Sequence, residues 1–157
     1  MLATDVLLTL LLATILIPIV VIDYGRMIIP NTLNATLLIA GVLTQSVASN
    51  GDLTASLLGG GLFFLIFAAV RLSFFHFTGK AGLGFGDVKF AGAAGVWIGP
   101  PSLPIFMFLS SVSALVAFST LTLAGKATRT TRLPFGPFLA LGLFCCWLSQ
   151  AFSLNIQ

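Results

Sequence analysis

Residues 82–90 read Gly82-Leu83-Gly84-Phe85-Gly86-Asp87-Val88-Lys89-Phe90, a glycine-rich loop that ends in a carboxylate and leads directly into an apolar run. The 157-residue chain contains only four acidic residues, and every one is an aspartate. An ionisable side chain at the mouth of a hydrophobic segment is costly to place there, so it marks a candidate functional site. We therefore expect Asp87 to act together with a partner from elsewhere in the chain.

The composition indicates a membrane protein. Hydrophobic residues make up 58% of the chain and charged residues only 7%, and the mean hydropathy is +1.13. Soluble domains are about one quarter charged, and a chain of this length cannot bury so much apolar surface in its own core. The basic residues are not clustered as in nucleic-acid-binding proteins, so no nucleic-acid partner is expected. The adjacent Cys145 and Cys146 lack the spacing of a zinc site and are interpreted as helix-packing residues.

Six apolar segments predict an all-α bundle of six transmembrane helices, forming one domain over residues 1–157. The segments run from about Val6 to Ile22, Leu33 to Ala48, Leu53 to about Val70, Asp87 to Ile98, Leu103 to Ala124 and Phe135 to Phe152. The first is expected to be retained, because a cleavable signal peptide begins with basic residues and none precedes this segment. The triplet Gly59-Gly60-Gly61 and the small residues 91–95 are expected to let helices approach closely.

Charge predicts the orientation of these segments. With six spans, successive loops alternate sides, and all seven basic residues then fall on one side, which the positive-inside rule makes cytoplasmic. These residues are Arg26, Arg71, Lys80, Lys89, Lys126, Arg129 and Arg132. Asp5 and Asp52 fall on the opposite side, and both termini are expected outside the cytoplasm.

The same topology places Asp23, at the end of the first segment, level with Asp87, at the start of the fourth. Two carboxylates at a membrane surface can work as a pair, in which one takes a proton from water and the other donates a proton to a substrate carbonyl. The sequence therefore predicts that Asp23 and Asp87 together cleave a peptide bond. The remaining metal-type ligands are scattered and His76 has no obvious nucleophile nearby, so neither a metal, a cofactor nor a serine-type triad is expected.

Each of these residues also has a plainer interpretation. Asp87 can simply cap the fourth helix, and Asp23 can be an ordinary interfacial residue. Lys89 can extend to the interface or offset the charge of the aspartates. His76 is typical of a packed interfacial residue.

A different class of function, a small proton-coupled transporter or an accessory membrane-assembly protein, would use the two aspartates as proton relays. Against it, both carboxylates are predicted at one membrane face rather than at the midplane.

Three motifs resemble those of a known family. Gly84-Phe85-Gly86-Asp87 resembles the GxGD signature of intramembrane-type aspartyl proteases, and with Val88-Lys89 it resembles the GxGDxK of type IV prepilin peptidases. Asp23 followed by Ile29-Pro30-Asn31 resembles the first catalytic aspartate of that family with its downstream IPN. The stretch Pro134-Phe135-Gly136-Pro137-Phe138-Leu139-Ala140 resembles PFGPFLA at the start of the last helix. The resemblance covers nearly the whole chain.

This resemblance implies that Asp23 and Asp87 are the catalytic pair, at the cytoplasmic face of the bacterial inner membrane. The expected partners are prepilins or pseudopilins and the lipid bilayer, and the positive charge of the removed leader would be drawn to the carboxylates. Residues expected to bind substrate or support the site are Pro30, Asn31, Gly84, Gly86, Lys89, Pro134 and Gly136. Larger members carry an N-terminal segment with paired CxxC motifs and also methylate the new N-terminus. This chain begins at the first segment, so it resembles the short, peptidase-only branch associated with Flp-type pili, and methyl transfer is expected to be absent.

Overall fold

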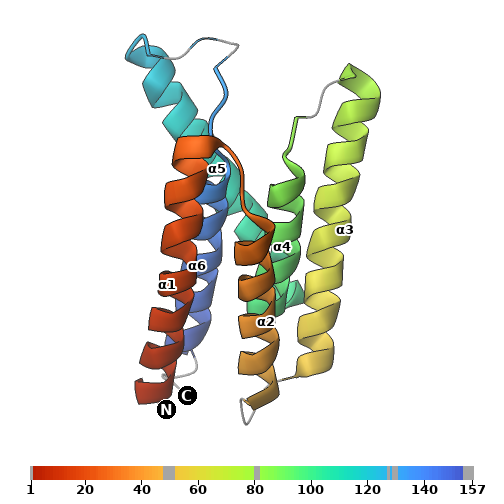
Figure 1. Ribbon diagram of the computed structural model, residues 1–157, viewed down its shortest axis with the longest axis vertical. Coiled ribbons are helices and arrows are strands. Elements are labelled where there is room, and N and C mark those ends of the chain that lie inside the picture. Colours follow the sequence, from red (N-terminus) through yellow and green to blue (C-terminus); the bar gives the residue numbers. More distant parts are fainter. Residues whose placement is uncertain (1, 48–51, 80–81, 127, 129–130, 154–157) are drawn as a thin grey trace.

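The computed structural model describes residues 2–47, 52–79, 82–126, 128 and 131–153. In this part of the chain the secondary structure is helical, as predicted, with six α-helices and one 3₁₀ turn. The elements are α1 (Leu2–Arg26), α2 (Asn31–Val47), α3 (Leu53–Thr78), α4 (Phe85–Ile98), η1 (Pro100–Ser102), α5 (Leu103–Leu123) and α6 (Gly136–Ser153). Successive helices alternate in direction, so the beginning of α1 and the end of α6 lie at the same end of the bundle (Figure 1).

The helices fall into a long and a short set. Three stretches are long and apolar enough to cross a membrane, namely Ala3–Arg26, Leu53–Thr78 and Pro100–Leu123. The other helices, α2, α4 and α6, have 17, 14 and 18 residues, fewer than the ~20 that a span usually needs. Large apolar side chains on the outer surface, such as Leu65 and Phe108, are exposed as expected for contact with lipid. The protein is therefore a polytopic helical membrane protein in which short helices lie among long ones.

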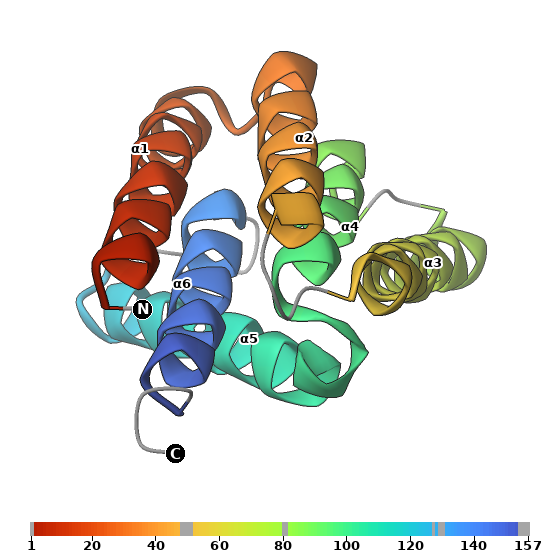
Figure 2. The same ribbon diagram turned by 90° about the horizontal axis from the view of Figure 1, so that it is seen from below.

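Helix α4 forms the centre of the bundle. Every residue from Phe90 to Ile98 is buried, because α4 packs against α2, α3 and α6. Figure 2 shows α3 on the side of α4 that faces away from α1 and α6. A Cβ added to Gly59 would lie 2.5 Å from the carbonyl oxygen of Gly95, so α3 and α4 touch at their backbones. The expectation that small residues allow close packing is confirmed here, although a Cβ on Gly61 would meet nothing within 4 Å.

Two helices continue further than the sequence predicted. Helix α1 runs through Asp23 to Arg26, and α3 continues past Val70 to Thr78. Residues 71–78 contain no Gly or Pro, so nothing interrupts the helix until Gly79, whose positive φ of 66° ends it. Arg71 and His76 consequently lie on a helix instead of in the long break that we expected.

Polar side chains hold the ends of the short helices. The indole N–H of Trp97 donates to the carbonyl oxygen of Leu37 at 2.8 Å, which ties α4 to α2. Gln150 of α6 donates to the carbonyl oxygen of Ile98 at 2.7 Å.

Cys146 is buried in the core and both cysteines are free, in keeping with the predicted packing role.

Candidate active site

Asp23 lies in the last turn of α1 and its side chain is only 3% exposed. Its Oδ2 accepts a hydrogen bond of 2.8 Å from the backbone N–H of Gly136, the first residue of α6. The first N–H groups of a helix have no partner within the helix and are suited to an anionic oxygen. A Cβ on Gly136 would lie 2.7 Å from that Oδ2, so a side chain at this position is incompatible with the observed contact.

Asp87 is the third residue of α4 and is 9% exposed. Its Oδ2 accepts a hydrogen bond of 3.1 Å from the N–H of Gly84, the residue that precedes the helix. This is the half of a capping box that a glycine N-cap allows, because glycine has no side chain to complete the other half. The capping interpretation of Asp87 is therefore confirmed, and it places the carboxylate at the helix entrance.

The two aspartates line one cavity of about 1040 Å³. Their carboxyl groups are close enough for electrostatic repulsion between them. The walls come from the end of α1 and the loop after it, the last turns of α3, the loop before α4 and the segment before α6. Figure 1 shows that the ends of these elements lie at the end of the bundle opposite the beginning of α1, so the cavity that they line is at this end. The predicted pairing of segment ends is found in the fold.

Basic side chains also line this cavity. Arg71 of α3 attracts the Asp87 carboxylate, and it donates a hydrogen bond to the carbonyl oxygen of Leu83. Two cations contact the ring of Phe85, with the Arg71 guanidinium carbon 5.9 Å and Lys89 Nζ 4.9 Å from its centroid. With Arg132, the described part of the lining holds three basic side chains beside the two carboxylates. These described residues therefore carry no net negative charge that would attract a basic leader.

The first turn of α4 packs against the loop after α1. A Cβ on Gly86 would lie 3.2 Å from Ile29 Cβ and 3.3 Å from its carbonyl oxygen. Asn34 of α2 is buried, and its side-chain amide donates a 3.1 Å hydrogen bond to the carbonyl oxygen of Gly86. Pro30 accepts the backbone N–H of Asn34 at 3.2 Å, at the start of α2. The GxGD-like and IPN-like stretches therefore form one packed unit.

Most residues singled out from the sequence come together here. The cavity lining includes Asp23, Asn31, Gly84, Gly86, Asp87, Lys89 and Pro134. Gly136 contacts Asp23, while Pro30 supports α2 from outside the lining. His76 is exposed on α3, contacts the ring of Phe77 and is not among the residues that line the cavity. Lys80 and Arg129 lie outside the described residues.

Two contributing residues were not identified as site residues from the sequence. Arg71 was assigned only a role in orientation, because the helix was expected to end before it. The sequence feature that indicates a helix continuing through Arg71 is the absence of Gly and Pro from residues 71–78. Asn34 was read as part of an apolar segment, and nothing in its local sequence indicates a contact with Gly86, 52 positions away.

The fold and this site define a helical membrane protein with a paired-carboxylate cavity at one end of the bundle. The sequence model of the type IV leader peptidase family matches residues 10–119, and the chain belongs to that family. It is 33% identical over 132 residues to the prepilin leader peptidase/N-methyltransferase of Aeromonas salmonicida strain A449, covering 84% of this chain and 45% of the relative. The Legionella pneumophila protein of the same name is 36% identical over 140 residues, covering 87% and 48%.

The chain spans about half the length of the curated relatives that it matches. A third relative with the same name, from Pectobacterium carotovorum subsp. carotovorum, is 31% identical over 147 residues, which is 92% of this chain and 52% of the relative. No solved structure matches the chain.

Proposed function

We propose that this protein is a membrane aspartyl endopeptidase that removes the basic leader of type IV, Flp-like prepilins or pseudopilins. The observation that carries the proposal is the placement of Asp23 and Asp87 in one cavity, each held by a glycine N–H. Membership of the type IV leader peptidase family supports the substrate class. The alternative of a proton relay through the bilayer is less well supported, because both aspartates line a cavity at one end of the bundle.

In the proposed mechanism, water attacks the carbonyl carbon of the scissile peptide bond. One carboxylate of the pair takes a proton from the water, and the other, protonated, donates a hydrogen bond and then a proton to the carbonyl oxygen. Collapse of the tetrahedral intermediate breaks the carbon–nitrogen bond, and the proton held by the first carboxyl group passes to the leaving amine. As the carbonyl re-forms, a hydroxyl of the intermediate returns a proton to the second carboxylate, which restores the starting state of the pair. Two adjacent carboxylates share a proton because both cannot ionise cheaply, which gives each residue the form that it needs.

Neighbouring groups keep this pair in position. The N–H of Gly136 binds Asp23, and the N–H of Gly84 binds Asp87. The Arg71 guanidinium offsets part of the negative charge near Asp87. We propose that these contacts aim the carboxyl groups at one reacting centre, since a small misplacement of catalytic groups is costly.

We further propose a single catalytic domain in the bacterial inner membrane, with the cavity at the cytoplasmic face and both termini outside. The placement of the basic side chains supports this orientation. Arg26, Lys126 and Arg132 follow or precede helices at the cavity end, whereas Asp5 and Asp52 belong to the other end.

The absence of methyl transfer stays a prediction. The relatives are named as both leader peptidases and N-methyltransferases, so the second activity requires its own measurement. Mass spectrometry of the product, with a methyl donor supplied, should find a free amine at the new N-terminus. A mass increase of one methyl group would contradict the prediction.

The direct test is cleavage by the purified chain in proteoliposomes. A tagged prepilin should lose its leader with the wild-type protein and keep it with the double variant Asp23→Asn/Asp87→Asn. No leader removal by a well-folded wild-type protein would refute the proposed activity. Aspartate-dependent proton flux across the vesicle membrane without cleavage would favour the transporter alternative.

A further inference from the structure

The link between α1 and α2 begins with a residue in an unusual backbone conformation. Four residues, 27–30, join the two helices. Met27 has a φ of 54°, and it is the one non-glycine residue with a positive φ in the part of the chain that the structure describes. A left-handed residue is common at the end of a helix, but it is usually glycine, because a Cβ makes this conformation unfavourable. Met27 is therefore strained where glycine would not be.

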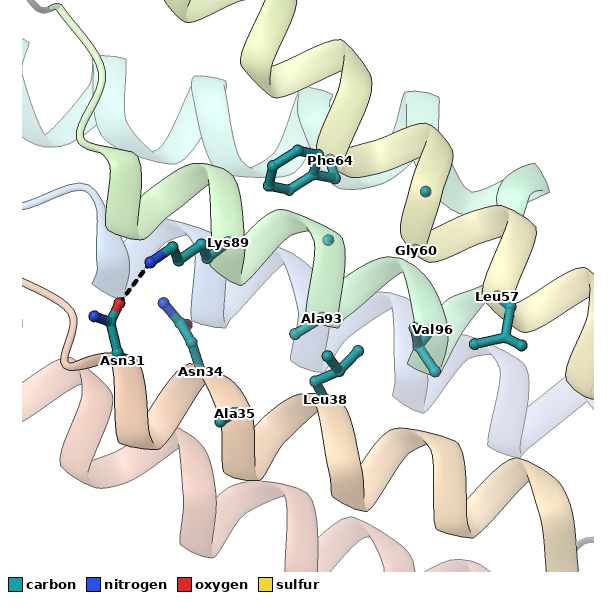
Figure 3. A pocket seen from close by; sticks show the side chains of 12 residues that line it. Asn31, Asn34, Ala35, Leu38, Leu57, Gly60, Phe64, Lys89, Ala93 and Val96 are labelled. Carbon is teal, nitrogen blue, oxygen red and sulfur yellow. Dashed lines mark hydrogen bonds between the residues drawn. The ribbon is translucent and has the colours of Figure 1, made fainter.

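The short link explains the backbone conformation. At its start, the N–H of Met27 donates a 2.8 Å hydrogen bond to the carbonyl oxygen of Asp23, whose side chain is bound to Gly136. At its end, Asn31 Oδ1 accepts a 2.8 Å hydrogen bond from Lys89 Nζ, beside a second pocket of about 430 Å³ between α2, α3 and α4 (Figure 3). Because both ends are fixed, the chain turns sharply at Met27. This requirement does not explain why the residue is methionine.

The side chain of Met27 is not used to build the fold. It is 53% exposed and does not belong to the hydrophobic core of the described residues. It lines the cavity of about 1040 Å³ together with Asp23 and Asp87. Strained residues of this kind cluster at active sites, where the strain accompanies a functional requirement. The side chain is thus the feature that glycine could not supply at this position.

We propose that Met27 is a substrate-binding residue whose side chain packs against the residues that flank the scissile bond of the polypeptide. This inference rests on the proposed function and adds a binding contact to it. Met27 follows Asp23 by four positions and closes a helical turn with it, so a chain bound at the carboxylates passes beside it. An unbranched thioether adapts to irregular surfaces, which suits an open cavity wall that a polypeptide enters and leaves.

Three substitutions separate the side chain from the backbone. Met27→Gly removes both the side chain and the strain, Met27→Ala removes the side chain but keeps a Cβ, and Met27→Leu keeps an apolar side chain of similar size. All three keep the N–H that bonds to Asp23. The Tm of Met27→Gly should exceed that of Met27→Ala by about 2–4 °C, because glycine adopts this backbone without strain. Equal Tm values would show an unstrained backbone and overturn the inference.

Cleavage should follow the side chain and not the strain. In vesicles of phosphatidylethanolamine and phosphatidylglycerol, Met27→Gly and Met27→Ala should each lower kcat/KM for a tagged precursor about tenfold, mainly through KM. Met27→Leu should stay close to the wild-type value. Val21→Ala, at an exposed position of α1 outside the cavity lining, is the matched control and should change neither constant.

The kinetic outcomes distinguish a substrate contact from a backbone role. A wild-type kcat/KM for Met27→Gly, a loss in only one of the two small variants, or a loss confined to kcat would overturn the inference. No cleavage by the wild-type protein would instead refute the proposed function.

Paired substitutions in enzyme and substrate test the contact itself. Wild type and Met27→Ala are compared on precursors with alanine at each of the three residues on either side of the scissile bond. Groups in contact have non-additive effects, whereas the effects of distant groups add. The loss caused by Met27→Ala should therefore shrink by at least about twofold at one or two of these positions. Additive effects at every position would overturn the inference.

Photo-crosslinking reports the contact without catalysis. A diazirine-containing amino acid replaces Met27 in the Asp87→Asn variant, which is mixed with the uncleaved precursor in the same vesicles. We expect an adduct with the precursor close to the scissile bond. The same group at Val21 should label lipid only. Lipid as the sole adduct at position 27 would overturn the inference. Because this measurement does not depend on cleavage, it separates a failure of the inference from a failure of the proposed function.

Discussion

The backbone N–H of Gly136 donates a 2.8 Å hydrogen bond to Oδ2 of Asp23, across 113 positions of sequence. This contact fixes the start of α6 to the last turn of α1. It also gives the Pro134–Ala140 motif a physical role, because the motif begins α6 where its free N–H can reach the carboxylate. The glycine is needed because any side chain would occupy the space of that carboxyl group.

Gly136→Ala should therefore displace Asp23 without unfolding the protein. We expect kcat for leader removal to fall about tenfold to a hundredfold, because a displacement of about 1 Å at a reacting group is costly. KM should change little, since Gly136 acts through Asp23 and is a positioning residue. Gly25→Ala is the control, because its added Cβ meets nothing within 4 Å. A normal kcat with Gly136→Ala would show that this contact does not aim the carboxylate.

The two aspartates should be separately essential. Asp23→Asn and Asp87→Asn should each lower cleavage by at least about 10²- to 10⁴-fold, because an amide cannot exchange the catalytic proton. Asparagine at position 87 can still accept the N–H of Gly84, so the start of α4 should remain capped. Steady-state cleavage and membrane protein level are measured together. Substantial cleavage by either variant at normal level would contradict the mechanism.

Asp5→Asn and Asp52→Asn serve as controls for that experiment. Both residues belong to the end of the bundle opposite the cavity. Asp52 caps α3 by accepting the N–H of Ala55 at 3.0 Å, and an asparagine oxygen can make the same bond. Near-wild-type cleavage is expected for both variants.

The sequence predicted the carboxylate pair because the relevant information is local. Asp23 closes one apolar segment and Asp87 opens another, so counting segments is enough to place them at one end. The hydrogen-bond donors of the two carboxylates differ in whether the local sequence reveals them. Gly84 precedes Asp87 by three positions and belongs to the same motif, whereas the contact between Asp23 and Gly136 depends on how α1 and α6 pack.

Helix ends were the weaker part of the sequence prediction. The sequence predicts that the third segment ends near Val70, before the charged Arg71, but the long apolar stem of an arginine allows it to remain in a helix at the membrane surface. The helix therefore continues to Gly79 and carries Arg71 into the cavity wall. The second pocket could not be predicted, since it depends on the lateral spacing of α2, α3 and α4.

Glycine 86 should tolerate no larger residue. The sequence predicts that Gly86 binds substrate or supports the site, and the structure places Ile29 within 3.2–3.4 Å of a Cβ added to it. Two of the nearest atoms are backbone atoms of Ile29, which cannot move aside cheaply. Gly86→Ala should reduce cleavage and Gly86→Val should abolish it, by separating the first turn of α4 from the loop before α2.

The measurement for Gly86 must separate loop packing from substrate contact. Limited proteolysis of the membrane-embedded variants reports on packing, and cleavage of the precursor reports on activity. We expect both to change together in Gly86→Val, and Gly25→Val to change neither. Activity lost with unaltered proteolysis would instead support direct contact between the first turn of α4 and the substrate. Near-normal cleavage by Gly86→Val would show that this packing does not position Asp87.

The shortest helix decides the membrane topology. Helix α4 has 14 residues and rises roughly 21 Å at ~1.5 Å per residue, less than a typical hydrocarbon core. Because it is buried among α2, α3 and α6, it does not need to match the lipid thickness alone. We therefore expect α4 and α5 to form a complete re-crossing, with Gly79 and Lys126 both on the cytoplasmic side and Asp52 outside.

Reporter fusions at these three positions test the expectation. Green fluorescent protein, which fluoresces only in the cytoplasm, should be bright at Gly79 and Lys126, and alkaline phosphatase should be active at Asp52. The fusions should also be made in the Asp87→Asn variant, so that loss of activity cannot alter the reading. If Gly79 and Lys126 read on opposite sides, α4 does not cross with the other helices. An external reading at Gly79 would place Asp87 at a different face than Asp23, and the pair could not share one water molecule.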